Sequence, residues 1–520
     1  MSVDTNNAAF QDALNLIQYT RQSVFLTGKA GTGKSTFLRY VCEHTKKKHV
    51  VLAPTGIAAI NAGGSTMHSF FKLPFYPLLP DDPNLSLQRG RIHEFFKYTK
   101  PHRKLLEQIE LVIIDEISMV RADLIDAIDR ILRVYSHNLR EPFGGKQLLL
   151  VGDVFQLEPV VKNDEREILN RAYPTPYFFS ARVFSQIDLV SIELQKVYRQ
   201  TDSVFVSVLD HIRTNTAGAA DLQLLNTRYG SHIEESEADM YITLATRRDT
   251  VDSINEKKLA ELAGEPITFE GSIEGDFPES SLPTSQELVL KPGAQIIFIK
   301  NDFDRRWVNG TIGVIAGIDE EEEKIYVITD DGKECDVKRE SWRNIRYRYN
   351  EKTKEIEEEV LGSFTQYPIR LAWAITVHKS QGLTFSRVVI DFTGGVFAGG
   401  QAYVALSRCT SLDGIQLKKP INRADIFVRP EIVNFAGRFN DRQAIDKALK
   451  QAQADVQYAA AARAFDKGDM EECLEQFFRA IHSRYDIEKP VPRRLIRRKL
   501  GIINTLQEQN KKLKEQMREQ

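Results

Sequence analysis

Cysteines, long apolar runs and an excess of charge of one sign are scarce or missing in this sequence. Its four cysteines, Cys42, Cys335, Cys409 and Cys473, are far apart and form no CxxC pair. That spacing argues for reduced thiols and against a disulfide framework or a zinc site. No apolar run approaches the roughly 18 residues that a membrane span needs. The first residues, MSVDTNNAAFQ, lack the basic start and apolar stretch of a signal peptide. We therefore expect a cytoplasmic protein, in the bacterial cytosol or at the nucleoid, with no membrane partner.

The balance of charge excludes a second class of protein. The chain has 70 Lys and Arg against 72 Asp and Glu, a net charge of −2, so it is no polycation that holds DNA by bulk charge. A groove with a local excess of Lys and Arg is still compatible with nucleic-acid binding. A length of 520 residues exceeds what one hydrophobic core fills, so several domains are expected.

Short β-rich runs alternate with helical stretches in the first half, which is typical of an α/β fold with a parallel sheet. The expected strands are Ser23–Thr27, His49–Ala53, Glu110–Asp115 and Gln147–Gly152. Each ends in a polar or glycine-rich segment. Because such sheets bind ligands at the carboxyl ends of their strands, these endings should converge in space.

The first ending is a P-loop. Its residues run Gly28, Lys29, Ala30, Gly31, Thr32, Gly33, Lys34, Ser35 and Thr36. Glycines let backbone N–H groups curl around phosphate oxygens, and the following helix adds its positive N-terminal end. Lys34 should reach the β- and γ-phosphates, and the Ser35 hydroxyl should ligate Mg²⁺. The alternative is a glycine-rich structural turn. The position between a strand and an amphipathic helix favours a site for ATP.

Two further endings offer groups for phosphate chemistry. Asp115 leaves a strand where a Walker B aspartate would hold Mg²⁺, and Glu116 follows it as a candidate general base. Alone, such a pair would equally fit a solvated helix cap. Gln156, in the fourth ending, offers an amide that can sense the γ-phosphate and orient water, although the segment would also fit an ordinary strand exit.

The motifs together resemble those of superfamily 1B helicases, in particular the PIF (petite integration frequency) family, relatives of the RecD-type helicases. The segments that carry the resemblance, in chain order, are PTGIAA (Pro54–Ala59), STMHSFF (Ser65–Phe71), DEISM, GDVFQLEPV, VYRQ (Val197–Gln200), TVHKSQG (Thr376–Gly382) and YVALSRC (Tyr403–Cys409). They span roughly residues 10–415. The resemblance implies an ATP-dependent DNA helicase, and at family level roles in DNA repair, recombination, telomere maintenance and G-quadruplex unwinding.

The resemblance also assigns residues around ATP. Gln11, seventeen residues before Gly28, matches the family's adenine-reading glutamine, although an exposed helix glutamine is the alternative. Arg199 and Arg408 look like the two arginines that the second half directs at the γ-phosphate, where their charge stabilises the transition state. Gln381 and Gly382 would link the DNA to the ATP cleft.

The same resemblance assigns contacts to single-stranded DNA. Its candidate phosphate contacts are Pro54, Thr55, Gly56 and His68 in the first half and Thr376, His378 and Lys379 in the second. Backbone, hydroxyl and imidazole groups can bind phosphates without reading sequence. His68 has a structural histidine as its alternative.

The rest of the chain divides into further expected regions. The fold class is α/β, with RecA-like domains at 1–188 and at 189–290 plus 365–430. Strands Tyr241–Ala245 and Arg387–Phe392 mark the second domain. A linker is expected at Gly271–Pro292. Alternating strands with DG and NG turns predict a small β-barrel at 291–364, which the family makes SH3-like, with Glu320–Glu323 at a solvated hairpin tip. The proline-rich segment Pro74–Lys100 resembles the family's wedge, although a plain surface loop fits it too.

Residues 431–520 are expected to be helical. Ala459–Ile481 faintly resembles one tetratricopeptide repeat, so this region is either a protein-partner site or a helical hairpin packed on the body. The cluster Arg493, Arg494, Arg497, Arg498 and Lys499 is either a DNA contact or a solvated helix face.

The expected function is ATP-driven translocation on single-stranded DNA by a monomeric motor that unwinds duplexes from single/double-strand junctions. The 5′-to-3′ direction rests on the resemblance. Two rival interpretations stay open. One is an ATPase that remodels DNA without separating its strands, and the other is a scaffold with a vestigial ATPase.

Overall fold

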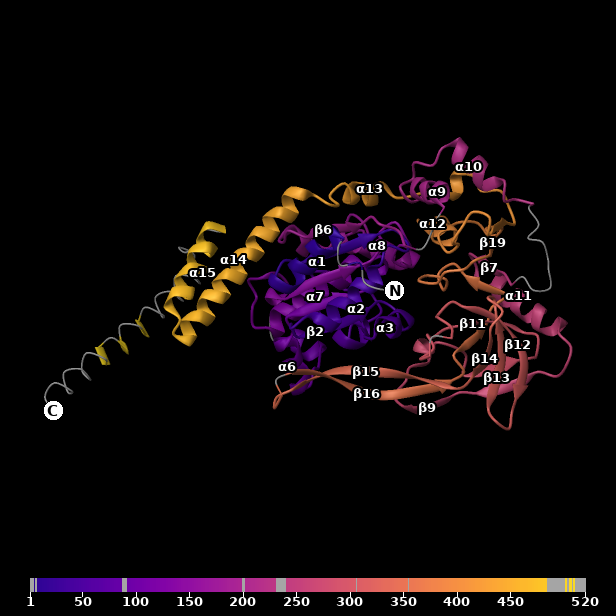
Figure 1. The fold of residues 1–520 in the computed structure, drawn as a ribbon, viewed down its shortest axis with the longest axis horizontal. Coiled ribbons are helices and arrows are strands. Elements are labelled where there is room, and N and C mark those ends of the chain that lie inside the picture. The colour runs from indigo at the N-terminus through magenta and orange to yellow at the C-terminus, as the bar shows by residue number, and fades with distance from the viewer. Residues whose placement is uncertain are drawn as a thin grey trace.

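The computed structural model describes residues 4, 7–86, 91–198, 202–230, 240–304, 306–353, 355–483, 501–502, 505–506 and 508–509. Two parallel sheets form the centres of its two halves, and antiparallel strands and a helical tail are attached to them (Figure 1). This confirms the predicted α/β class. Across the described ranges, no helix combines the length and the apolar character that a membrane span requires.

The first parallel sheet has the strand order β3-β2-β4-β5-β1-β6. Its strands are β1 (Val24–Gly28), β2 (His49–Ala53), β3 (Ser65–Thr66), β4 (Leu111–Ile114), β5 (Gln147–Val151) and β6 (Val190–Leu194). The four strands predicted in this half are confirmed to within a residue at each end. They are apolar runs buried on both faces, as expected for a parallel sheet covered by helices.

Helices cover both faces of this sheet. They are α1 (Ala8–Tyr19), α2 (Lys34–His44), α3 (Gly56–Ala62), α4 (Met67–Phe71), α5 (Arg91–Phe95), α6 (Lys100–Gln108), α7 (Ala122–Tyr135) and α8 (Asn163–Leu169). Helices α1 and α2 bury one core with the sheet, and α4, α6 and α7 contribute to another. Helix α7 buries apolar residues at helical spacing, such as Ile125, Ile128 and Leu132.

The predicted boundary between the first and second domains, at residues 188/189, is wrong. It separates β6 from the first sheet, whereas β6 pairs in parallel with β1 along its whole length, with Val24 opposite Val190 and Gly28 opposite Leu194. The first sheet therefore extends to Leu194. Pairing between strands about 165 residues apart is a tertiary contact that local periodicity does not report.

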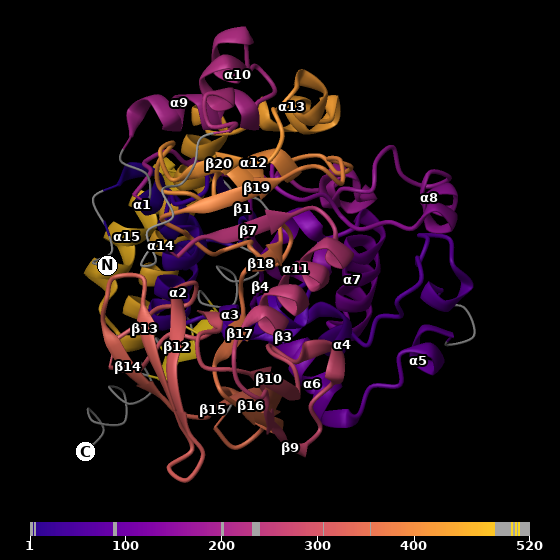
Figure 2. The ribbon, with the colours of Figure 1, turned by 90° about the vertical axis from the view of Figure 1, so that its right-hand side faces the viewer.

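The second parallel sheet has the order β18-β7-β19-β20. Its strands are β7 (Ile242–Ala245), β18 (Ala374–Thr376), β19 (Val388–Asp391) and β20 (Ile415–Leu417), and its helices are α9 (Ser203–Arg213), α10 (Ala219–Asn226), α11 (Arg248–Glu261) and α12 (Gln401–Leu406). It has a hydrophobic core of its own. In Figure 2, α9 and α10 lie above this sheet and the antiparallel strands lie below it.

The antiparallel region is built around a five-stranded sheet of order β14-β13-β12-β11-β17. The strands are β11 (Gln295–Phe298), β12 (Ile312–Asp319), β13 (Lys324–Thr329), β14 (Glu334–Val337) and β17 (Ile369–Leu371). Phe298, Trp307 and Tyr367 lie in its separate core. Residues Glu320–Glu323 form the exposed turn between β12 and β13, which confirms the predicted hairpin tip.

The predicted linker Gly271–Pro292 is wrong, and so are the limits 291–364. Strand β8 (Ile267–Glu270) pairs with β10 (Glu287–Leu290), and β9 (Ser272–Gly275) pairs with β16 (Glu355–Gln366). Gly271 allows close packing, since a Cβ there would lie 2.6 Å from the Phe364 ring. The two ends of the predicted linker therefore form paired strands, with a loop at 276–286 between them, and the region runs from β8 to β17.

A long hairpin connects this region to the first half. Strand β15 (Glu340–Asn350) pairs with β16, and the two extend beneath α6 (Figure 1). Ile345, Tyr347 and Tyr349 of β15 are buried in the core of the first half. The Val51 N–H donates to the Tyr347 hydroxyl oxygen at 3.3 Å.

The tail forms a helical hairpin that packs on the body. Its helices are α13 (Pro430–Ala436), α14 (Arg442–Lys467) and α15 (Met470–Ser483), with α14 beside α1 and β6 in Figure 1. Ile445 and Ala448 are buried in the core shared with α1 and α2, and Arg442 forms an ion pair with Asp12. The basic cluster at Arg493–Lys499 lies outside the described residues.

These contacts predict where the tail can be cut. Truncation after Lys450 keeps Ile445 and Ala448 on the body, so DNA-stimulated ATP hydrolysis should survive. Truncation after Phe435 removes both residues and also Phe439, which contacts Phe25. Burying one such large side chain stabilises a fold by about 1.5–3 kcal/mol, so the shorter chain should unfold at a clearly lower temperature. Thermal unfolding and ATPase assays of the two truncations test this, and equal stability would contradict the packing role of α14.

Candidate nucleotide site and nucleic-acid contacts

A cavity of about 1080 Å³ lies between the two halves. Its walls bring together residues far apart in the sequence, namely Asp4, Asn7, Phe10, Ala30, Gly31, Thr32, Gly33, Lys34, Ser35, Thr36, Asp115, Glu116, Gly152, Gln156, Leu194, Lys196, Tyr198, Gly382, Thr384, Arg408 and Thr410. The predicted convergence is therefore found for the endings of β1, β4 and β5, whereas the ending of β2 at Pro54 does not line this cavity. Most of the predicted nucleotide residues line this one cavity.

The P-loop joins β1 to α2. Gly28, Gly31 and Gly33 have φ values of 152°, 80° and 90°, in the region where glycine is favoured. A Cβ on Gly28 would lie 2.6 Å from the Leu194 carbonyl oxygen, so β6 also requires glycine there. The Lys34 ammonium lies back across the loop and donates to the carbonyls of Gly28 at 2.6 Å and Lys29 at 3.0 Å.

Two adjacent carboxyls face the P-loop from the end of β4. The Glu116 N–H donates to Asp115 Oδ1 at 2.9 Å. Burial, and next the charge of Asp115, raise the pKa of Glu116 to about 7, whereas Lys34 and Arg408 act in the opposite direction. Burial raises the pKa of Asp115 as well. The carboxylates therefore need nearby cations to be stable in their ionised form.

Gln381 connects the second half directly to these groups. Its Nε2 donates to Glu116 Oε2 at 2.9 Å and to Gln156 Oε1 at 3.2 Å. The structure thus brings together three predicted residues from three separate motifs. Two of them come from the first half and one from the turn that follows β18.

Arg408 lines the cavity from the second half. Its side chain is only 1% exposed, and it donates to the carbonyl oxygens of Val404 (2.9 Å) and Leu383 (3.2 Å) and to Ser407 Oγ (3.0 Å). These bonds hold the guanidinium at the cavity wall. Arg199, the other predicted arginine, lies outside the described residues.

Part of the cavity lining was missed by the sequence analysis. Asp4, Asn7, Phe10, Lys196 and Tyr198 line the cavity. The predicted adenine reader Gln11 is not among the lining residues; it is exposed on α1, and its N–H donates to the Asn7 carbonyl. The side chain of Asn7 caps α1 by accepting from Ala9 and Phe10 N–H groups. An asparagine just before an apolar-periodic run is a recognisable N-cap signal.

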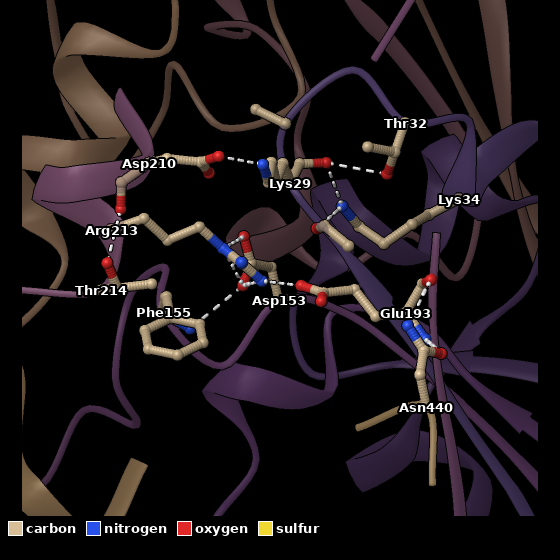
Figure 3. A network of polar contacts seen from close by, with 12 residues as sticks. Lys29, Thr32, Lys34, Asp153, Phe155, Glu193, Asp210, Arg213, Thr214 and Asn440 are labelled. Carbon is tan, nitrogen blue, oxygen red and sulfur yellow. Dashed lines mark hydrogen bonds and ion pairs between the residues drawn. The ribbon is translucent and has the colours of Figure 1, made fainter. Parts of the chain in front are cut away.

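A second group of missed residues joins the halves beside the cavity (Figure 3). Arg213 of α9 is 3% exposed, and it forms ion pairs with Asp153 at 3.1 Å and Glu193 at 2.8 Å. Lys29 of the P-loop pairs with Asp210 of α9. The Ala30 N–H donates to the Tyr403 hydroxyl oxygen at 3.0 Å, so α12 also contacts the P-loop.

The buried position of Arg213 predicts a large effect on stability. Arg213→Ala leaves the buried Asp153 and the partly buried Glu193 without their cation, and breaking such a buried pair typically costs about 3–5 kcal/mol. We expect denaturant unfolding to show a loss of this size. Lys257→Ala is the control, because Lys257 pairs with Glu261 at the surface with 77% of its side chain exposed. Similar losses in both variants would contradict the role assigned to the buried network.

The predicted DNA residues take equivalent positions in the two halves. Thr55 follows β2 and accepts the Ala58 N–H on Oγ1 at 3.2 Å. Thr376 ends β18 and accepts the Lys379 N–H at the same distance. Pro54 and Gly56 flank Thr55. A Cβ on Gly56 would lie 2.6 Å from Ser281 Oγ, so a protein side chain, Ser281, packs closely against this glycine.

The two predicted DNA histidines are partly buried. His68 lies on α4 and His378 in the turn after β18. Burial lowers the pKa of both imidazoles, which are therefore neutral near pH 7. Thr376 and Lys379 also line a groove of about 800 Å³ beside α11, together with Arg248 and Arg370.

Comparisons with known proteins agree with this arrangement. Residues 4–217 match the family described as PIF1-like helicase. The chain is 34% identical over 412 residues to ATP-dependent DNA helicase Pif1 of Campylobacter jejuni, covering 76% of this chain and 88% of that protein. The corresponding protein of Bdellovibrio bacteriovorus is 31% identical over 439 residues, with coverages of 82% and 90%. The chain belongs to the PIF1-like helicase family. It is therefore an ATP-dependent DNA helicase, as predicted.

Solved structures of this family share the fold. Bacteroides sp Pif1 in complex with ADP-AlF4 superposes with a TM-score of 0.76 at 41% identity, covering 83% of this chain and 96% of that one. Bacteroides Pif1 bound to single-stranded DNA gives a TM-score of 0.60 at 40% identity, with coverages of 85% and 99%. Roles in repair, recombination and telomere maintenance belong to the family level.

Proposed function

We propose that this PIF1-like helicase hydrolyses Mg²⁺-ATP in the cavity between two RecA-like domains and translocates 5′-to-3′ on single-stranded DNA. The domains are residues up to Leu194 and the regions around β7 and β19, with the β8–β17 region as an SH3-like barrel. The observation that carries the proposal is the contact of Gln381 with Glu116 and Gln156. Gln381 follows the predicted DNA-binding residues of its turn, and its side chain contacts both Glu116 and Gln156, the two groups assigned to hydrolysis.

The donors in the cavity fit a magnesium ion. Ser35 offers a hydroxyl and Asp115 a carboxylate, the hard oxygen ligands that Mg²⁺ prefers. Burial raises the pKa of Asp115, and a cation beside this carboxylate would stabilise its charged form. When bound, the ion would neutralise charge on the phosphates. Lys34 would exchange its bonds to the Gly28 and Lys29 carbonyls for phosphate oxygens.

Hydrolysis would combine groups from both halves. Glu116 would accept a proton from the attacking water, and Gln156 would orient that water. Arg408 would stabilise the charge that develops on the phosphoryl group. Arg199 stays a candidate for a second such arginine, and Gln11 for an adenine contact. Asn7 and Tyr198 are stronger candidates for contacts to the base because they line the cavity.

Coupling between ATP and DNA would run through one short turn. Thr376, His378 and Lys379 are the proposed phosphate contacts, and Gln381 follows two residues later with its contacts in the ATP cavity. A movement of this turn during closure of the cleft would therefore change the contacts at both the ATP site and the DNA site. Thr55, Gly56 and their neighbours would provide the matching contact in the first half, so that the two halves can bind the strand alternately.

Solved structures of relatives support DNA as the partner. One reports Bacteroides Pif1 bound to single-stranded DNA, and another reports unwinding at forked double-stranded DNA by two coordinating Pif1 helicases. For this chain we propose single strands and junctions as ligands, and a monomeric motor in which residues from both halves of one chain line the nucleotide cavity. Contacts to phosphates predict binding that tolerates any sequence and weakens with salt.

The direction of movement is tested by unwinding. Two duplexes of identical sequence carry a single-stranded tail at either the 5′ or the 3′ end, and strand separation is followed by fluorescence with ATP and Mg²⁺. We expect separation of the 5′-tailed duplex only. Preference for the 3′ tail would refute the proposed polarity, and ATP hydrolysis without separation of either duplex would favour an ATPase that only remodels DNA.

A further inference from the structure

Each of the two predicted DNA histidines stacks on a phenylalanine that is exposed to solvent. The rings of His68 and Phe75 have centroids 4.9 Å apart and an interplanar angle of 13°. The rings of His378 and Phe397 are 6.4 Å apart at 18°. Phe75 is 82% exposed and Phe397 is 61% exposed. The first pair belongs to the first half of the motor and the second pair to the second half.

Single exposed apolar side chains are common on protein surfaces and need no function. Here the same arrangement occurs twice, and the two pairs arise by different routes along the chain. Phe75 follows His68 by seven residues in the proline-rich segment after α4. Phe397 follows His378 by nineteen residues, after β19. A shared local sequence motif therefore does not explain the repetition, whereas a shared ligand does.

The surroundings of Phe397 fit a nucleic-acid strand. Phe397 lines a hollow of about 540 Å³ together with Arg247, Arg248 and Gly394. Arg247 is held there by donating from Nε to the Gly394 carbonyl at 3.2 Å. Arg248 also lines the neighbouring groove that contains Thr376 and Lys379. The exposed ring thus lies beside two arginines, and one of them, Arg248, also lines the groove of the proposed phosphate contacts.

Phe75 also lies next to a predicted DNA motif. His68, which backs its ring, comes from the same STMHSFF segment as Thr66, whose side chain caps α4 by accepting from Ser69 N–H. Tyr76, the next residue, is 51% exposed. A flat ring held from behind by a partly buried imidazole keeps its outer face available without the entropy cost of being ordered on binding.

We propose that Phe75 and Phe397 are base-stacking platforms, one on each half of the motor, each held in place by a histidine of the adjacent DNA motif. This inference rests on the proposed function and deepens it. Phosphate contacts hold the backbone of the strand, and the platforms hold its bases. Any base presents a flat face to an aromatic ring, so stacking keeps binding tolerant of sequence. Each half would then contact a nucleotide through both its phosphate and its base.

The experiment compares two labelled strands on the full chain. One is an oligothymidine, and the other has the same length and the same phosphates but abasic sites throughout. Fluorescence anisotropy gives the Kd of each strand for the wild type, Phe75→Ala, Phe397→Ala and the double variant. Phe303→Ala is the matched control, because Phe303 is 95% exposed on the loop after β11. The thermal unfolding midpoint shows that each variant is folded.

We expect Phe75→Ala and Phe397→Ala each to weaken oligothymidine binding by about five- to a hundredfold, the range of one lost base stack, and to leave abasic binding within about twofold of the wild type. Phe→Trp at either position should retain binding, and Phe→Leu should not. Equal weakening of both strands, or no weakening of either, would overturn the proposal. Lys379→Ala separately tests the phosphate contact. It should weaken both strands by the same factor, and a failure there would refute that contact without affecting the result on stacking.

Discussion

Replacing Arg408 with alanine should slow ATP hydrolysis by about a thousandfold, the typical effect of losing an arginine that completes a phosphoryl-transfer site. Lys34, Asp115 and Glu116 all come from the first half, so they can bind nucleotide without help. Arg408 comes from the second half and lines the same cavity. Its charge should matter most in the transition state, and kcat should fall much more than the affinity for ATP. Single-turnover hydrolysis and equilibrium nucleotide binding measure the two quantities separately.

Arg408→Lys is the matched variant, and we expect it to recover little activity. An ammonium keeps the charge but lacks the planar fork of donors, which here binds Val404, Leu383 and Ser407. Since those bonds also support the fold locally, thermal unfolding must accompany the kinetics. A folded Arg408→Ala protein with near-normal DNA-stimulated turnover would show that the second half does not complete the ATP site.

Replacing Lys34 with alanine should abolish unwinding and reduce ATP hydrolysis by roughly a hundredfold or more, as expected when a preorganised charge facing the phosphates is removed. Binding of single-stranded DNA should remain measurable, because the proposed DNA contacts follow β2 and β18 and not the P-loop. Lys29→Ala is a useful comparison. Lys29 lies in the same loop but pairs with Asp210 of α9, so it should affect the contact between the halves more than the phosphates.

Anisotropy with a labelled oligonucleotide and a coupled ATPase assay distinguish these effects. Loss of DNA binding in a folded Lys34→Ala protein would contradict the separation of the nucleotide site from the DNA contacts. Hydrolysis at the wild-type rate would remove Lys34 from the site altogether.

The strands and motifs of the two parallel sheets could be predicted because their signals are local. A run such as His49–Ala53 is largely apolar and is followed by residues that break the pattern. The sequence therefore predicts both that it is a strand and where the strand ends. The P-loop signal is equally local. Its glycines stand at the positions where the backbone has a positive φ, namely Gly28, Gly31 and Gly33. The order of the motifs was enough to indicate the family.

Predictions failed where long-range pairing determines the structure. Gly271–Pro292 has the composition of a linker, but β9 and β10 find partners in β16 and β8, and Gly271 is required by the Phe364 ring. The boundary at 188/189 failed because β6 completes the sheet beside β1. An unpaired strand of four or five residues has little stability of its own, so its neighbours across the sheet, and not its sequence, decide whether it forms.

The sequence by itself determined the family, the parallel α/β core and the residues proposed to face phosphate, since each depends on residue types at short spacings. Only the tertiary structure decided which groups meet across the cleft. The contacts of Gln381 with Glu116 and Gln156, of Arg213 with Asp153 and Glu193, and of Tyr403 with Ala30 each join chain segments that are at least 20 residues apart, and up to 373. The same is true of Phe397 beside His378. Such contacts exist only once the two cores have packed, because burial and distance in three dimensions, and not spacing along the chain, determine their strength.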